Sequence, residues 1–134
     1  MKTTAAVLLV ATSMTAQAAE PATLTLACKG TVTITTAKDA KPEPVSMGII
    51  VNFTARTVTG FEDDYPVTIT AVDDLHISFS GSRGNRWRIE GSMDRVTGDM
   101  EAGWTTWDLT RDLKYKVAWS QLLWLKCRPT QRMF

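Results

Sequence analysis

Apolar and polar positions alternate along most of this chain with a period of two, which is typical of β-strands that have one buried face. The longest such run covers residues 24–34, and a second covers residues 45–53. Shorter β-branched runs follow at residues 57–61, 66–72 and 75–81. In the last of these runs Leu75, Ile77 and Phe79 have the phase of core residues. The pattern predicts five strands in this part of the chain. Residues 37–44, with two prolines and four charges, are predicted as a loop.

Residues 86–106 predict a hairpin with a definite register. Apolar side chains alternate on both sides of residues 95–98, a four-residue loop in which Gly98 is free to take a positive φ. A slip of one residue would turn one apolar set outward, so a single nearby register keeps both sets on one face. That register pairs Met93 with Met100, Gly91 with Ala102 and Ile89 with Trp104.

Residues 109–121 leave two interpretations open. Leu109, Leu113 and Val117 are four residues apart, which gives a weak helical spacing. The alternation that follows favours a strand from about Val117 to Arg128.

The whole pattern predicts an all-β domain, an antiparallel meander that forms a small closed or nearly closed barrel of about eight strands. Cys28 has the apolar phase of the first strand and Cys127 that of the last. A disulfide between them would hold the terminal strands together and remove the free edges of the sheet. Two free buried thiols are the alternative. A barrel of this size has room for packed side chains or for one small ligand.

The N-terminal residues have the pattern of an export signal. Lys2 precedes an uncharged stretch, residues 3–17, which leads to Ala18 in a small-residue cleavage pattern. We expect a signal peptide over residues 1–18, a single domain over 19–134 and a periplasmic or extracellular location, which suits a disulfide. The apolar centre is too short to span a bilayer, so no transmembrane segment is expected in the mature chain. A retained membrane anchor is the weaker alternative.

Composition narrows the function classes. The chain has 134 residues, 44% of them hydrophobic and 22% charged, which argues for a folded domain. Its 15 Lys and Arg nearly balance 14 Asp and Glu, for a net charge of +1. Nucleic acid is therefore not an expected partner, because a general nucleic-acid binder carries a strong basic excess.

Groups for catalysis or metal binding are few. Asp74, His76 and Ser78 share one face of a predicted strand, but same-face neighbours lie roughly 6.5–7 Å apart at Cα, too far for a catalytic triad. The acidic pairs 63–64 and 73–74 lack the spacing of a calcium loop, and one His with two Cys is too few for zinc. We therefore expect no enzyme activity, no metal and no cofactor.

One binding candidate is the arginine-rich segment 82–88. Arg83, Arg86 and Arg88 surround Trp87, and guanidinium groups beside an indole suit a carboxylate, a phosphate or a sugar. The alternative is a solvated hairpin end whose arginines pair with acids such as Glu101.

A second candidate is the aromatic C-terminal third, which contains four tryptophans and Tyr115. Such rings line ligand pockets and protein interfaces, although they are more often core. By strand phase we expect Trp87 and Trp104 to be buried, and Trp107 and Trp124 to be exposed and available for a ligand.

Three segments, residues 46–53, 91–98 and 125–134, resemble small exported bacterial proteins of unknown function. The expected architecture is similar to lipocalin-like and avidin-like barrels, and this resemblance implies a ligand site in the barrel mouth. Lipocalins have Gly-x-Trp in their first strand, whereas here Gly30 is followed by Thr31 and Val32. The sequence thus predicts an exported non-enzymatic binding protein of the cell envelope that recognises a small ligand or another envelope component. The alternative is a protein-interaction or enzyme-inhibitor module that acts by surface recognition.

Overall fold

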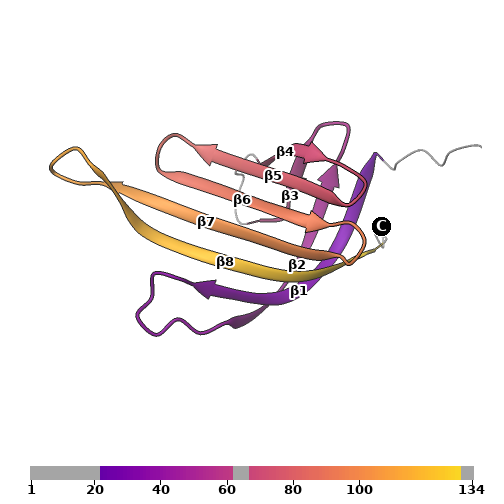
Figure 1. Cartoon of the computed structure of the whole chain (residues 1–134), viewed down its shortest axis with the longest axis horizontal. Coiled ribbons are helices and arrows are strands. Elements are labelled where there is room, and N and C mark those ends of the chain that lie inside the picture. Colours follow the sequence, from indigo (N-terminus) through magenta and orange to yellow (C-terminus); the bar gives the residue numbers. More distant parts are fainter. Residues whose placement is uncertain (1–21, 62–66, 131–134) are drawn as a thin grey trace, which may run out of the picture.

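The computed structural model describes residues 22–61 and 67–130, and within them the chain is an antiparallel β-barrel (Figure 1). Each strand pairs with the next one along the chain, and β8 pairs with β1 to close the barrel. The predicted all-β meander is therefore confirmed, including its closure. The predicted signal peptide, residues 1–18, lies outside the described residues. The strands are β1 (Thr23–Ile34), β2 (Glu43–Asn52), β3 (Thr57–Thr59), β4 (Val67–Val72), β5 (His76–Arg83), β6 (Trp87–Asp94), β7 (Asp99–Leu109) and β8 (Tyr115–Pro129).

A disulfide joins the first and last strands, as predicted from strand phase. Cys28 of β1 lies directly opposite Cys127 of β8, and their sulfur atoms are bonded at 2.05 Å. Both side chains are buried in the core. The bond therefore lies on the inner side of the seam that closes the barrel.

Inward-facing side chains from all eight strands fill the middle of the barrel. Three aromatic rings form part of this core: the ring of Phe61 lies 5.4 Å from the rings of both Phe79 and Trp104, measured between centroids. Trp87 and Trp104 are buried, as their strand phase predicted. Side chains thus pack the middle of the barrel, and the two large grooves lie at its rim and on its outer wall.

The predicted hairpin of residues 86–106 is confirmed, since β6 and β7 pair in the expected register. The Asp94 carboxylate accepts hydrogen bonds from the backbone N–H groups of Val96 and Thr97, at 2.8 and 2.9 Å, and these bonds lower the pKa of Asp94. Gly98 has a φ of 78°, and a Cβ there would lie 2.2 Å from the backbone oxygen of Cys127. Glycine is thus required on both grounds.

Residues 109–121 contain no helix, which decides between the two interpretations of the sequence. β7 continues to Leu109 and β8 begins at Tyr115, so the two strands form one long hairpin. Leu109 ends β7, Leu113 lies in the turn and Val117 lies in β8. Their spacing of four residues therefore does not mark one face of a helix.

Other boundaries also differ from the prediction. Leu75 was expected in the core but is 54% exposed. The reason is local, because the Asp73 carboxylate accepts the backbone N–H groups of Leu75 and His76 and so holds Leu75 in a bend just before β5, which begins at His76. β5 then continues through Arg83, two residues beyond the predicted run 75–81, and β3 is shorter than the run 57–61.

Candidate functional site

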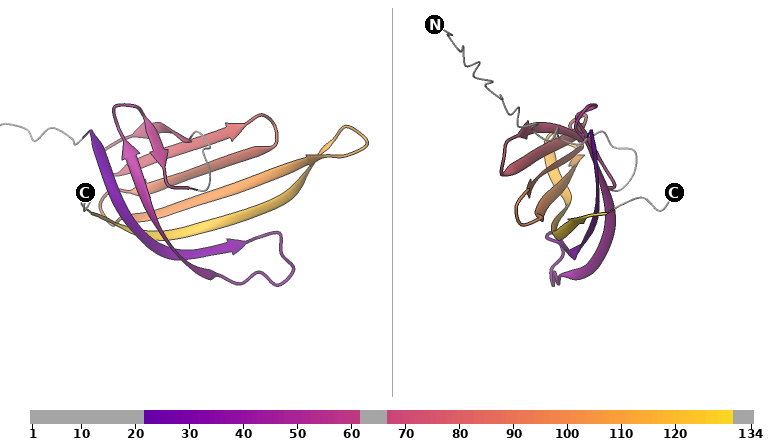
Figure 2. Two further views of the ribbon diagram at one scale, coloured as in Figure 1. Left: turned by 180° about the vertical axis from the view of Figure 1, so that it is seen from behind. Right: turned by 90° about the vertical axis from the view of Figure 1, so that its right-hand side faces the viewer.

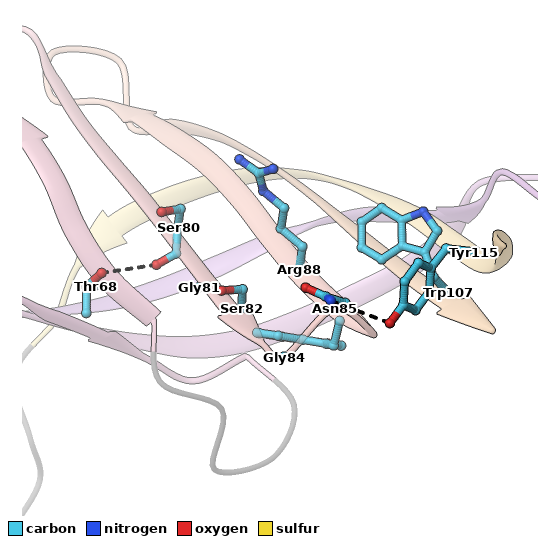
Figure 3. A pocket seen from close by; sticks show the side chains of 10 residues that line it. Thr68, Ser80, Gly81, Ser82, Gly84, Asn85, Arg88, Trp107 and Tyr115 are labelled. Carbon is cyan, nitrogen blue, oxygen red and sulfur yellow. Dashed lines mark hydrogen bonds between the residues drawn. The ribbon is translucent and has the colours of Figure 1, made fainter. Parts of the chain in front are cut away.

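A groove of about 790 Å³ opens beside the tip of the β5–β6 hairpin (Figure 3). We call it the hairpin groove. Strands β4 to β8 and the β5–β6 turn all contribute to it, so residues far apart in the sequence meet here. Its described lining residues are Thr68, Ser80, Gly81, Ser82, Gly84, Asn85, Trp87, Arg88, Trp107 and Tyr115.

One wall of the hairpin groove is polar. Strand pairing sets Thr68 opposite Ser80, and Ser82 opposite Arg88, so three hydroxyl groups and a guanidinium group lie on neighbouring strands. The Thr68 hydroxyl donates a hydrogen bond of 3.2 Å to the backbone oxygen of Ser80. The wall therefore presents closely spaced groups that can donate or accept hydrogen bonds to a polar ligand.

The other wall is aromatic and belongs to the β7–β8 hairpin. Figure 3 shows the rings of Trp107 and Tyr115 together beyond Asn85, at the end of the groove away from Thr68. The Asn85 side-chain nitrogen donates a long hydrogen bond of 3.4 Å to the Tyr115 hydroxyl. The backbone N–H of Trp107 donates to the backbone oxygen of Arg86 at 2.9 Å. These two contacts attach the aromatic wall to the turn of the β5–β6 hairpin.

Trp107 is half-buried rather than exposed as predicted. Strand phase failed there because the β7–β8 register shifts between Thr106 and Trp107. A register shift of this kind redirects the side chains that follow it, which is how the indole comes to line the groove.

The three predicted arginines differ in their relation to the hairpin groove. All are exposed, but Arg88 alone is among the described residues that line the groove, while Arg83 ends β5 and Arg86 lies in the turn. Arg88 forms a charge-assisted hydrogen bond with Glu90, two residues along the same strand, rather than the pairing with Glu101 considered from the sequence. The pair is exposed, so Coulomb attraction between its members is weak and Arg88 can turn to an anionic ligand.

Trp124 is 52% exposed, as predicted, but it does not line the hairpin groove. It faces outward from β8 into a second groove of about 590 Å³, which Lys29, Glu101 and Lys126 also line. Lys126 donates to Asp99 at 2.9 Å, and this bond lowers the pKa of Asp99. Trp107 and Trp124, both predicted to be available for a ligand, thus lie in two different grooves.

Several residues of the hairpin groove were not predicted as site residues. Thr68 and Ser80 carry no signal in the sequence, because short polar side chains are common on the outer face of any strand. Ser82 and Asn85 lie within the predicted segment 82–88 but were given no role of their own. Tyr115 was noted as part of the aromatic third without a role of its own. Only the pairing of strands reveals that these residues converge.

The residues considered for catalysis or metal binding lie apart from the hairpin groove. His76 is exposed on β5, with its Nδ1 atom 3.8 Å from the Asp73 carboxylate. The backbone bonds from Leu75 and His76 lower the pKa of Asp73. Within residues 22–61 and 67–130 no three His, Cys, Asp or Glu side chains are grouped to hold a metal, and no helix is long and apolar enough to cross a membrane. The pair 63–64 lies outside the described residues.

Comparisons with protein-family models, with curated proteins and with solved structures find no match to this chain. The resemblance to small exported bacterial proteins, and to lipocalin-like and avidin-like barrels beyond the barrel itself, stays a prediction.

Proposed function

We propose that this chain is an exported, non-enzymatic binding protein of the cell envelope that holds a small anionic sugar in the hairpin groove. The observation that carries the proposal is that one groove is lined by the Arg88 guanidinium, the Trp107 indole and three hydroxyl groups, those of Thr68, Ser80 and Ser82. Sugar hydroxyls need closely spaced donors and acceptors, and sugar C–H faces pack on aromatic rings. A guanidinium group adds bidentate recognition of a carboxylate or phosphate.

The chemistry of the lining favours binding over catalysis. A serine becomes a nucleophile when a neighbouring base takes its proton. The described groups that line the groove beside Ser80 and Ser82 are hydroxyl, amide, guanidinium and aromatic, and these orient a ligand rather than accept a proton from it. The Glu90 carboxylate lies opposite Ser80 on β6 but bonds to the Arg88 guanidinium, which stabilises its charged form and makes it a weaker base.

Two features support export. The Cys28–Cys127 disulfide suits a chain that folds in an oxidising compartment. The residues before the barrel have the composition of a cleavable signal, as argued above. An exported barrel would meet the sugars of the envelope.

Trp107→Ala is expected to weaken sugar binding by about tenfold or more, because a loss of about 1.4 kcal/mol of contact corresponds to a factor of ten and truncated tryptophans often cost more. The measurement is a titration of the exported protein with glucose, glucuronate and glucose 6-phosphate, followed by amide and indole chemical shifts. The two anionic sugars should shift residues 80–88 and the Trp107 indole more strongly than glucose does.

The matched control is Trp124→Ala, which removes an exposed indole from the second groove and should leave the titration unchanged. If none of the three sugars shifts residues 80–88, or if Trp124→Ala weakens binding as much as Trp107→Ala, the proposed site is wrong.

Replacing Arg83, Arg86 and Arg88 together with Gln is expected to leave the melting transition within a few degrees of the original, because exposed ion pairs contribute roughly 0–1 kcal/mol. The same variant should lose the preference for glucuronate over glucose and most of the salt dependence of binding. Arg88→Gln alone should reproduce the lost preference. Arg86→Gln, on the same hairpin but outside the groove, should not. Loss of folding in the triple variant would show instead that the arginines are structural.

A further inference from the structure

The β7–β8 hairpin extends beyond the rest of the barrel as a two-stranded ribbon (Figure 2). Pairing between β6 and β7 ends at Trp87 opposite Thr106, and pairing between β1 and β8 ends at Ile34 opposite Gln121. From there β7 and β8 continue paired with each other as far as Leu109 opposite Tyr115. We call residues 107–117 the ribbon.

One face of the ribbon is apolar. Trp107 pairs with Val117 and Leu109 with Tyr115, and since directly opposite residues share a face and the face repeats every second residue, all four lie on the same side. Leu109, Tyr115 and Val117 are exposed. The pair between them, Asp108 opposite Lys116, occupies the other face. The ribbon is therefore amphipathic, and its apolar face begins at the aromatic wall of the hairpin groove.

The tip of the ribbon carries a leucine in a conformation that favours glycine. Leu113 has a φ of 58° and is 79% exposed. Its backbone N–H donates to the oxygen of Thr110 at 3.0 Å, and the N–H of Thr110 donates to the oxygen of Lys114 at 2.8 Å. This is a turn followed by one left-handed residue, where Gly is preferred because a Cβ clashes. Leu113 is thus unfavourable both in its backbone conformation and in its exposure to water.

The charges around Leu113 indicate what it contacts. Within residues 107–117 the cations Arg111, Lys114 and Lys116 outnumber Asp108 and Asp112 by one. Basic residues beside exposed leucine and tyrosine are the combination that binds the interface of an anionic bilayer. A protein interface needs a broad surface of about 800 Å² on each partner, whereas a bilayer accepts a narrow apolar wedge.

We propose that the ribbon inserts Leu113 and the outer part of its apolar face into an anionic phospholipid bilayer, with the three cations at the headgroups. The barrel would then stand on the membrane with the hairpin groove at the base of the ribbon. This inference does not depend on the sugar-binding proposal, because the vesicle experiment contains no sugar and the sugar titration contains no lipid.

The test is sedimentation of the exported protein with vesicles of phosphatidylcholine alone and of phosphatidylcholine mixed with phosphatidylglycerol. The original protein should bind the mixed vesicles, release from them as salt is raised, and bind the neutral ones weakly. Leu113→Asn should lower binding to the mixed vesicles by about tenfold or more while the melting temperature stays the same or rises, because Asn tolerates the left-handed conformation without the apolar side chain.

The matched control is Val96→Asn. Val96 is 74% exposed in the β6–β7 turn, at the opposite end of β7 from Leu113, so it tests loss of an exposed apolar side chain away from the ribbon. This variant should bind vesicles as the original protein does. The proposal is overturned if the original protein does not sediment with the mixed vesicles, if it binds neutral vesicles equally well, or if Leu113→Asn and Val96→Asn behave alike. Self-association through the ribbon, seen as a dimer that Leu113→Asn dissolves without any vesicle binding, would also overturn it.

Discussion

Removal of the disulfide by Cys28→Ala together with Cys127→Ala is expected to lower the free energy of unfolding by roughly 3–5 kcal/mol, because the bond closes a loop of 99 residues and so restricts the unfolded chain strongly. For a domain of this size the melting temperature should fall by roughly 10–20 °C. Thermal unfolding followed by circular dichroism measures the shift.

The effect is expected to be large because the bond spans almost the whole barrel. Pairing of β1 with β8 is the contact that closes the sheet, and in the unfolded chain these strands are the most distant in sequence. Without the bond, folding has to bring them together at the full cost of loop closure. Alanine is the suitable replacement because both cysteines are buried, and serine would bury a hydroxyl group without a partner.

The original protein under a reducing agent is the matched control. It should unfold close to the temperature of the double variant, since both lack the same cross-link. A double variant that melts within about 3 °C of the oxidised protein would contradict the prediction, as would an oxidised protein in which both thiols can be alkylated.

The barrel could be predicted from sequence because its controlling signal is local. Alternation with a period of two follows directly from the geometry of a strand, and the shared apolar phase of Cys28 and Cys127 was enough to predict which strands close the sheet. The β6–β7 register was predictable for the same reason, because a slip would have exposed Ile89 or Trp104.

The hairpin groove could not be predicted because its lining depends on contacts between strands. Ser80 and Thr68 meet through the β4–β5 register, while Trp107 reaches the groove through an irregularity in the β7–β8 pairing that no local pattern announces. Among the arginines, phase alone does not distinguish Arg88 within β6 from Arg86 in the turn before it. The chemistry of segment 82–88 is therefore visible in the sequence, whereas its geometry depends on the strand pairing.

Gly30→Ala is expected to destabilise the barrel by about 3 kcal/mol or more, which places it among the most damaging single substitutions available to this chain. Gly30 lies on β1 opposite Leu125 of β8. A Cβ at this position would lie 1.8 Å from the backbone oxygen of Trp124 and 2.9 Å from the Cα of Leu125. These are backbone atoms, so no change of rotamer relieves the contact. The methyl group has to push β8 away from β1 two residues from the disulfide that holds them.

Gly48→Ala is the matched control, because it adds the same methyl group on the other side of β1. Gly48 of β2 lies opposite Ala27, and the nearest atom to a Cβ there is the Leu26 oxygen at 3.9 Å, an ordinary contact. Its stability should stay within about 0.5 kcal/mol of the original, since a glycine within a strand has more entropy to lose than alanine. Urea denaturation compares the two variants, and amide hydrogen exchange should show faster opening along β1 and β8 in Gly30→Ala alone. Equal losses in both variants would mean that glycine is needed for backbone freedom, whereas a loss confined to Gly30→Ala locates the requirement in the close approach of β8 to β1.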